Sequence, residues 1–269
     1  TGNYFSKTVD LRIPGPGVPF VFERHYNSQD ATDGPLGFGW NHSYNVRLTV
    51  DAGGHVIVRW GDGRQDAFVP DGSGGFTPQY GIFDTLIDNG DGTYSLKKKN
   101  QTVYNFNPSN RLASIVDKNS NAVSLNYTGS DLTSITDSAG RTISLTNDGS
   151  GRITQLTDPI GRSVQYTYDA NGDLVSSTDP NGNVTNYTYD ANHQVLTVVD
   201  PRGNTLVSNV YDADKRVVTS QQDAKGGQTT FVYDEANRKT TVTQPLGRVR
   251  QCHRQDRSFW QHHHHHLRC

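Results

Sequence analysis

One short pattern of residues recurs through most of the second half of this chain. YTYDANGDLVSSTDPNGN occupies residues 166–183, and YTYDANHQVLTVVDPRGN follows at 187–204. Aligning the copies on the residue that follows each Asp/Asn/Gly turn gives a series spaced by 20 to 22 residues: Leu112, Leu132, Ile153, Leu174, Val195, Val217 and Lys239. Fixed periods of this length mark proteins built by stacking one small unit after another. The pattern therefore predicts a repeat architecture.

Each unit carries two turn signals, and these supply the residues that we expect to matter most. In the second signal, Asp at position i, Pro at i+1 and Gly at i+3 suit a type I turn. The first signal consists of Tyr168, Asp169 and Gly172, with the later copies Tyr189, Asp190, Tyr211, Asp212, Tyr233 and Asp234. The second consists of Asp158, Pro159 and Gly161, then Asp179, Pro180 and Gly182, then Asp200, Pro201 and Gly203. We predict structural turn roles for all of them.

Between the turns lie short runs in which apolar and polar residues alternate. In SVQYTY (163–168), Val164, Tyr166 and Tyr168 share one side of an extended strand, and the intervening polar residues share the other. Alternation with period two is typical of an antiparallel sheet with one solvated face. No comparable 3.6-residue period is present, so each unit is predicted to be a β-hairpin and the fold to be all-β.

Successive hairpins are expected to pair side by side into one long sheet. Seven units would supply up to ~14 strands, and open twisted sheets rarely exceed ~10 strands without curling. We therefore predict a long sheet of antiparallel β-hairpin repeats that curves into a wall. Repetition on this scale extends a surface rather than building a single site.

The first hundred residues lack the repeat but remain rich in strand and turn signals. Trp40 and Trp60 lie among glycines and alternating strands, and terminal units of repeat arrays often have an atypical capping sequence. The sequence thus divides into a β-rich lead-in module at 1–104, repeats at 105–249 and a tail at 250–269.

The tail departs from the repeat. RQCHRQDRSFWQHHHHHLRC contains both cysteines, Cys252 and Cys269, and consecutive histidines. Such a run is typical of a purification tag or out-of-frame sequence. The alternative, a native histidine metal site, lacks the separated ligand spacing of a structural zinc site. We exclude the tail from functional interpretation.

The repeats and the lead-in module resemble those of RHS/YD-repeat proteins. YDANGDLVSSTDPNGNVTNYTYD is similar to the repeat itself, whereas FERHYNS, GPLGFGWNHSYNVRL and GDGRQDAF resemble the module that precedes it in bacterial members. The resemblance covers about residues 1–248. It implies a β-sheet that spirals into a hollow shell enclosing a C-terminal toxin domain, as in polymorphic toxins and insecticidal toxin complexes.

The resemblance also implies partners and a location. The partners would be the remainder of the same chain with its enclosed effector, and components of a secretion system or toxin complex. Bacterial members are secreted or lie on the cell surface, and we expect the export signals to lie outside residues 1–269. The C-terminal segment linked to self-cleavage in these proteins has no counterpart in this sequence, so neither protease nor toxin activity carries over.

The sequence offers weak signals for catalysis or cofactor binding. His25, His42, His55 and His193 have no helical metal spacing, and we interpret them as packing or surface residues. The repeated Asp158, Asp179 and Asp200 lie one repeat apart and before proline, which favours turn roles over acid/base pairs. DNGDGTY and DGSGG lack a full calcium loop, and G-x-S-x-G is absent. We expect no metal, no cofactor and no enzymatic activity.

The bulk properties restrict the partners. A net charge of −2 provides no footprint for nucleic acid or an anionic membrane, and no apolar run approaches the ~20 residues of a membrane span. Two alternative functions remain open. One is a carbohydrate-binding module that uses Tyr166 and Tyr187 for stacking, and a weaker one is a hydrolase built around His25 or His42. Open sheet edges would also favour self-association.

Overall fold

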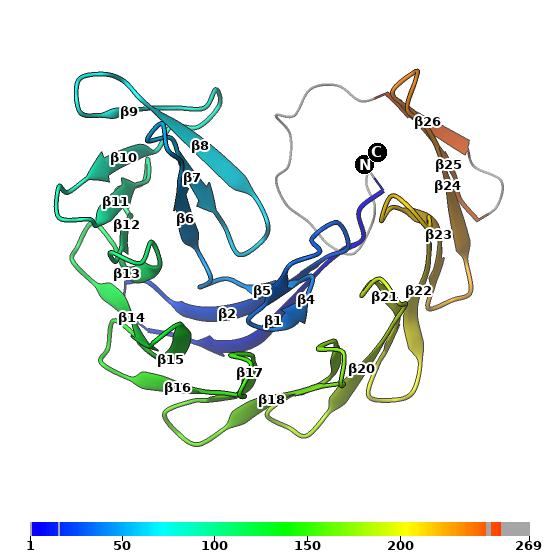
Figure 1. The fold of residues 1–269 in the computed structure, drawn as a ribbon. Helices are drawn as coiled ribbons and strands as arrows, with labels where there is room; N and C mark the ends of the chain where they lie inside the picture. The colour runs from blue at the N-terminus through cyan, green and yellow to red at the C-terminus, as the bar shows by residue number, and fades with distance from the viewer. Residues whose placement is uncertain (1, 16, 246–248, 254–269) are drawn as a thin grey trace. The chain divides into compact units, whose positions relative to one another are not determined.

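The computed structural model describes residues 2–15, 17–245 and 249–253, the last five by their backbone alone. Every regular element in these ranges is a β-strand (Figure 1). This confirms the predicted all-β class. Within the same ranges, no helix has the length and apolar character needed to cross a membrane.

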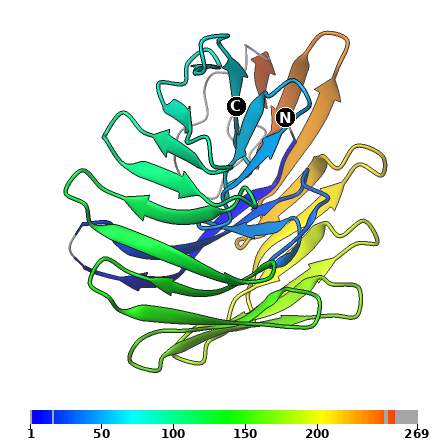
Figure 2. The same cartoon turned by 60° about the vertical axis from the view of Figure 1, so that its left-hand side comes forward.

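Among the described residues, the largest sheet contains seventeen strands in the order of the sequence. Its neighbouring strands form antiparallel hairpins, which is the predicted arrangement (Figure 2). The strands are β10 (Thr85–Asp88), β11 (Tyr94–Lys97), β12 (Val103–Phe106), β13 (Leu112–Val116), β14 (Ala122–Thr128), β15 (Asp131–Thr136), β16 (Thr142–Asn147), β17 (Ile153–Thr157), β18 (Ser163–Tyr168), β19 (Leu174–Thr178), β20 (Val184–Tyr189), β21 (Val195–Val199), β22 (Thr205–Tyr211), β23 (Val218–Asp223), β24 (Gln228–Asp234), β25 (Lys239–Thr243) and β26 (Val249–His253).

The remaining strands form three smaller sheets near the N-terminus. The first has the order β1 (Phe5–Ile13), β2 (Phe20–Asn27) and β5 (Trp40–His42), and the second is the short pair β3 (Asp33–Gly34) and β4 (Gly37–Phe38). The third is the meander β6 (Arg47–Val50), β7 (Val56–Arg59), β8 (Gln65–Pro70) and β9 (Phe76–Pro78).

The long sheet starts at Thr85, inside the expected lead-in module. The hairpins at this end already use the turn chemistry of the repeats. Between β12 and β13, for example, the Asn107 side-chain oxygen accepts hydrogen bonds from the backbone N–H groups of Ser109 and Arg111. An Asn in place of the repeat Asp hides this similarity in the sequence.

By its internal contacts the chain divides into two compact units. One contains Thr1–Lys7, Tyr26–Trp40 and Gln165–Cys269, and the other contains Thr8–His25 and Asn41–Val164. Both units thus combine lead-in residues with repeats. We call them the C-terminal unit and the N-terminal unit, after the repeats that each contains.

The core of the N-terminal unit is aromatic. The rings of Phe20 and Tyr44 stack with centroids 5.4 Å apart, and Trp60 meets Tyr104 edge-on at 5.2 Å. Arg24 is fully buried, and its guanidinium donates two hydrogen bonds to the carboxylate of Asp10 at 2.9 and 3.1 Å. Bidentate pairing of this kind is what makes a buried charge tolerable.

In the C-terminal unit, lead-in residues pack on the apolar face of the repeats. The Trp40 ring lies 5.2 Å from that of Tyr187 and 5.0 Å from that of Tyr26. The Tyr26 hydroxyl accepts a hydrogen bond from the backbone N–H of Val195 at 2.9 Å. The aromatic side of these hairpins therefore packs against a second segment as well as against its own neighbours.

Candidate functional site: the repeat turns and their tyrosines

The proline-containing turns are held by one aspartate each. In the turn at 158–162, the Gly161 N–H donates to the Asp158 carbonyl at 3.0 Å, which is the bond of a β-turn. One oxygen of the Asp158 carboxylate accepts from the N–H groups of Ile160 and Arg162 at 3.0 and 2.9 Å. The i+1 position needs no N–H in this scheme, which is why Pro159 fits there.

The tyrosine-containing turns use the same scheme. Asp169 accepts from the N–H groups of Asn171 and Asp173, both at 2.9 Å, and the Gly172 N–H donates to the Asp169 carbonyl at 3.2 Å. The two turn signals of the sequence thus form one kind of turn. Carboxylates that accept backbone N–H bonds in the same way belong to Asp179, Asp190, Asp200, Asp212 and Asp234.

Each of these turns contains one residue with a positive φ, which is the fourth in most turns and the fifth in those that start at Asp212 and Asp234. The φ is +84° at Gly161, +82° at Gly182, +83° at Gly203 and +92° at Gly172. In three later tyrosine turns other residues take this conformation: His193 (61°), Arg216 (53°) and Arg238 (50°). Residues with a Cβ adopt this conformation only with backbone strain. Glycine would therefore be the more favourable residue for the turn itself at these three positions.

The electrostatics of the turns favour ionised carboxylates. Hydrogen bonds from the side chains of Asn183 and Asn204 are the main cause of the lowered pKa values of Asp179 and Asp200. For Asp158, burial raises the pKa, but the hydrogen bonds from Arg162 and backbone N–H groups outweigh it and leave the pKa lowered. A carboxylate engaged in this way acts as an acceptor within its own turn.

A β-bulge lies beside three of the four tyrosine turns, whereas β24 and β25 pair without a register shift. Between β18 and β19, Thr167 pairs with Ser176 while Tyr168 pairs with Leu174, so Val175 is the extra residue. The same shift recurs between β20 and β21 and between β22 and β23. A bulge disrupts the hydrogen-bond ladder locally, which leaves backbone groups that need partners.

The repeat tyrosines supply such a partner. The Tyr189 hydroxyl donates to the Leu174 carbonyl at 2.7 Å, and Tyr233 does the same to Val218 at 2.7 Å. Tyr211 donates to Val195 and Tyr127 to Leu112, both at 2.9 Å. Burial raises the pKa of Tyr127 to about 12 and that of Tyr189 well above its usual value. Each phenol therefore stays neutral and joins its hairpin to the preceding one.

Sequence reasoning missed this tyrosine bond. Its signal is a constant spacing, because the donor and acceptor lie 15 residues apart in three of the four pairs and 16 in the fourth. At one unit an Asn replaces the Tyr, and the Asn147 side-chain N–H donates to the Leu132 carbonyl at 3.0 Å, again across 15 residues.

The tyrosines considered for carbohydrate stacking are buried. Tyr166 is 2% exposed and Tyr187 is 6% exposed. Their rings cannot stack on a sugar in this state, so the structure does not favour the carbohydrate-binding alternative.

The histidines considered for hydrolysis lie inside the N-terminal unit. His42 stacks on Phe22 with ring centroids 4.8 Å apart, and burial lowers its pKa to about 3. His25 is also buried and lies 3.9 Å from the carboxylate of Glu23. The exposed His55 pairs with Asp51 within one turn. Among the described residues, no group of three or more His, Cys, Asp or Glu side chains is placed to hold a metal ion.

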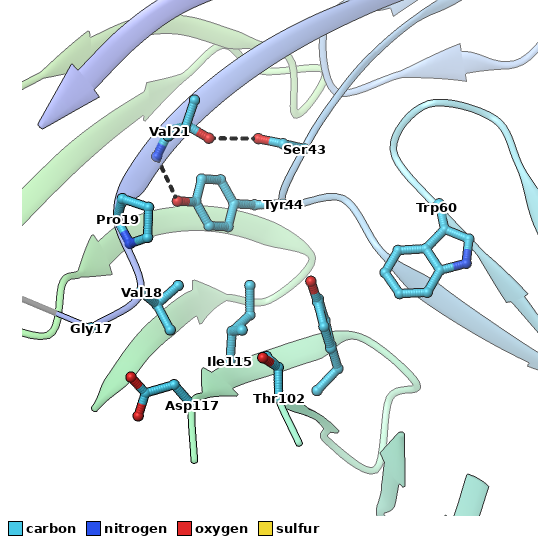
Figure 3. A pocket seen from close by; sticks show the side chains of 11 residues that line it. Gly17, Val18, Pro19, Val21, Ser43, Tyr44, Trp60, Thr102, Ile115 and Asp117 are labelled. Atoms are coloured by element: carbon cyan, nitrogen blue, oxygen red, sulfur yellow. Dashed lines mark hydrogen bonds between the residues drawn. The ribbon is translucent and has the colours of Figure 1, made fainter. Parts of the chain in front are cut away.

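One pocket of about 400 Å³ lies in the N-terminal unit (Figure 3). Its polar groups brace the surrounding backbone. The Tyr44 hydroxyl accepts from the Val21 N–H at 3.1 Å, and the Ser43 hydroxyl donates to the Val21 carbonyl at 2.9 Å. The lining residues are Gly17, Val18, Pro19, Val21, Ser43, Tyr44, Trp60, Thr102, Tyr104, Ile115 and Asp117. This set contains no histidine or cysteine, and its one carboxylate caps a turn through Asn121.

Two family models match parts of the chain. A domain of unknown function, DUF6531, matches residues 1–68, and the RHS Repeat matches 148–182, 168–205 and 211–249. The first match coincides with most of the predicted lead-in module, and the second with the later repeats.

Curated relatives are similar over part of the chain. The tRNA nuclease WapA of Bacillus subtilis is 30% identical over 128 residues, which is 47% of this chain and 5% of that protein. The probable deoxyribonuclease RhsB of Dickeya dadantii is 33% identical over 109 residues, which is 39% of this chain and 7% of that protein. The chain thus spans a small fraction of either relative.

Solved structures that the chain matches include the crystal structure of TcdB2-TccC3. It has 11% sequence identity and a TM-score of 0.31, and the alignment covers 93% of this chain and 15% of that one. A version described as TcdB2-TccC3-TEV gives 12% identity and a TM-score of 0.27, with 92% and 19% covered.

Proposed function

Because this chain is an RHS/YD-repeat protein, we propose that it is a non-catalytic segment of a wall that encloses a C-terminal toxin or effector and helps to deliver it. The wall would be a hollow shell formed by the curving repeat sheet. The remainder of the same polypeptide would supply both the rest of the wall and the enclosed cargo.

One observation carries this proposal: every repeat adds the same hairpin to the same sheet. The turn aspartate, the residue with positive φ and the bond from tyrosine to the preceding unit recur from copy to copy. A reaction centre needs a unique arrangement of groups, whereas identical units produce area. The structure is thus suited to covering a large object.

The solvent face of the hairpins fits a polypeptide cargo or water equally well. Cross-strand pairs of neutral polar side chains occupy it, such as Ser95 with Asn105 at 3.0 Å and Asn105 with Ser114 at 2.9 Å. Thr188 and Thr197 are paired in the same way at 2.6 Å. Neutral polar groups select neither acidic nor basic partners, so such a surface suits cargoes of varied sequence.

The relatives suggest where an activity would reside. WapA and RhsB are named as nucleases, and the matches cover 5% and 7% of their lengths. We propose that the corresponding effector of this protein lies outside the repeats. The two organisms are bacteria, and an exported or cell-surface bacterial protein, assembled with a secretion system or toxin complex, accords with this role.

The test uses the complete genomic reading frame that contains this sequence. After expression of that protein, limited proteolysis should leave the polypeptide downstream of residue 249 intact while the repeats remain folded. A variant with Gly182→Val and Gly203→Val, which disrupts two turns, should expose the same region to cleavage. Cleavage of the downstream region at equal rates in both proteins would overturn the enclosing role.

A separate assay tests the absence of catalysis. Residues 1–249, purified alone, are incubated with tRNA and with double-stranded DNA, the substrate types named for the relatives. We expect no turnover above a buffer control. Turnover that disappears in the His42→Phe variant would instead identify the N-terminal unit as an enzyme.

A further inference from the structure

Three consecutive tyrosine turns of the C-terminal unit contact one lead-in segment through the turn residue that has a positive φ. The segment is residues 26–40, which we call the strap. What the three contact residues share is a positive φ, a conformation that favours glycine. Counted from the turn Asp, this residue is the fourth in the first two turns and the fifth in the third, which is one residue longer. Gly172, His193 and Arg216 are the residues with positive φ in the three turns.

The first turn contacts the strap by close backbone approach. A Cβ atom added to Gly37 would lie 2.6 Å from the Gly172 carbonyl oxygen, and Gly37 itself has a φ of +87°. No side chain fits between the strap and the turn at this point. The glycine of the turn and the glycine of the strap thus allow direct contact.

The second turn contacts the strap through an imidazole ring. The ring of His193 stacks on Phe38 with centroids 3.8 Å apart and an interplanar angle of 13°. Its Nδ1 atom lies 3.0 Å from each carboxylate oxygen of Asp173, which belongs to the preceding turn. Asp173 therefore fixes the orientation of the ring that supports Phe38.

The third turn contacts the strap through a guanidinium group. Arg216 donates from Nε to the carbonyl oxygen of Ser28 at 2.9 Å. It also donates from Nη1 to the carbonyl oxygen of Asn192 at 2.6 Å, in the second turn. The same side chain thus joins the strap to a neighbouring hairpin.

These contacts explain why two residues with a Cβ adopt an unfavourable backbone conformation. His193 and Arg216 have φ values of 61° and 53°, and a residue with a Cβ is strained in this region relative to glycine. Arg238 of the next turn has a φ of 50° but is exposed, and its backbone N–H bonds only within the turn. Local turn chemistry does not require the long side chains at 193 and 216, whereas the strap contacts do.

We propose that the residue with positive φ in these tyrosine turns is where the repeats hold the strap, and that His193 and Arg216 are positioning residues which fix residues 26–40 on the aromatic face. The strap in turn completes that face. Trp40 donates from Nε1 to the Tyr189 hydroxyl at 2.8 Å, so the strap also contacts the tyrosine that joins two hairpins. Release of the strap would expose aromatic rings that are now buried.

Hydrogen exchange of the whole chain, followed by mass spectrometry, tests this inference. The reporters are strap amides with defined acceptors: Asn27 N–H to the Gly39 carbonyl, Ser28 N–H to Tyr4, and Gly39 N–H to Thr32. His193→Gly and Arg216→Gly should each raise the exchange rate of these amides by about tenfold or more, equivalent to ~1.4 kcal/mol of local opening. Amides of β14 in the N-terminal unit should exchange as in the unmodified chain.

Matched controls separate positioning from backbone strain. Arg238→Gly and Ser120→Gly remove a Cβ at the same kind of position, where φ is 50° and 66°, and both residues are exposed. They should leave strap exchange within about twofold of the unmodified chain. If position 193 served the turn alone, glycine there would slow exchange, and unchanged or slower exchange in His193→Gly overturns the proposal.

A second substitution covers poor folding of the glycine variants. His193→Asn keeps a residue that tolerates positive φ but lacks a ring to stack on Phe38. Strap exchange should again rise, and combining it with Phe38→Leu should add little, because both changes remove the same contact. Full additivity of the two changes would show that the ring contact does not hold the strap.

Discussion

The hydroxyl of Tyr189 donates a hydrogen bond to the carbonyl of Leu174, 2.7 Å away and 15 residues earlier in the chain. This bond crosses from one hairpin to the hairpin before it, at the bulge where the ladder shifts. Repeat proteins gain stability from the interface between neighbours as well as from each unit. In this sheet the tyrosine hydrogen bond belongs to the interface between neighbouring hairpins, and it recurs wherever the repeat supplies the tyrosine.

Tyr189→Phe should lower the free energy of unfolding by about 1–3 kcal/mol, because a part-buried carbonyl and the Trp40 N–H both lose their partner. Urea denaturation measures the change. Tyr80→Phe is the matched control, since the Tyr80 side chain is 97% exposed, and it should stay within ~0.5 kcal/mol of the unmodified protein. Equal stability of the two variants would contradict a structural role for the phenol.

Gly182→Ala should destabilise the protein by about 1–3 kcal/mol through backbone strain alone. The φ of Gly182 is +82°, and no heavy atom lies within 4 Å of the position that a Cβ would take. Gly149 also has open space around it but no positive φ, so Gly149→Ala should be neutral or stabilising by ~0.4–1 kcal/mol. Thermal melting of the pair separates strain from packing, and an equal shift in both would refute the turn geometry.

The repeat hairpins could be predicted because two local signals agree. Alternation in SVQYTY places Val164 and Tyr166 on the buried side, as observed, and Asp with Gly at fixed positions marks each reversal of the chain. Both signals depend on the backbone within a few residues. Period and turn chemistry are therefore enough to identify the strands and their antiparallel order.

The bulges and the strap could not be predicted in this way. A bulge adds one residue to one strand, as at Val175, and the alternation pattern does not show where the ladder will shift. The bond between Trp40 and Tyr189 joins residues 149 positions apart, and nothing near Trp40 in the sequence identifies its partner. His193 was recognisable as a substitute for glycine, but its reason lies in Phe38, which only the three-dimensional structure brings close.

His42 should make the protein less stable as the pH falls below neutrality. Burial lowers the pKa of His42 from 6.5 to about 3, so between these values the unfolded chain binds a proton that the folded chain does not. Stability is then lost on acidification, by up to ~1.4 kcal/mol per pH unit from this one group. In melting experiments between pH 7 and pH 4, His42→Phe should show a smaller loss than the unmodified protein.

The control for this prediction is His55→Ala, because His55 is half exposed and its contact with Asp51 lies within a single turn. This variant should retain the acid-dependent loss of the unmodified protein. A His42→Phe variant that still loses as much stability between pH 7 and pH 4 would show that another group causes the effect.

The turn carboxylates should add a second loss of stability at lower pH. The pKa values of Asp158, Asp179 and Asp200 are lowered in the folded state, so their contribution is present above the unfolded value of about 4 and disappears as the pH falls through the lower folded values. Asp158→Ala should therefore lower the melting temperature at pH 7 and reduce the further drop between pH 4 and pH 2. Asp214→Ala, at an exposed turn position, should change neither quantity. If Asp158→Ala leaves the drop below pH 4 as large as before, its carboxylate does not hold the turn in the ionised form.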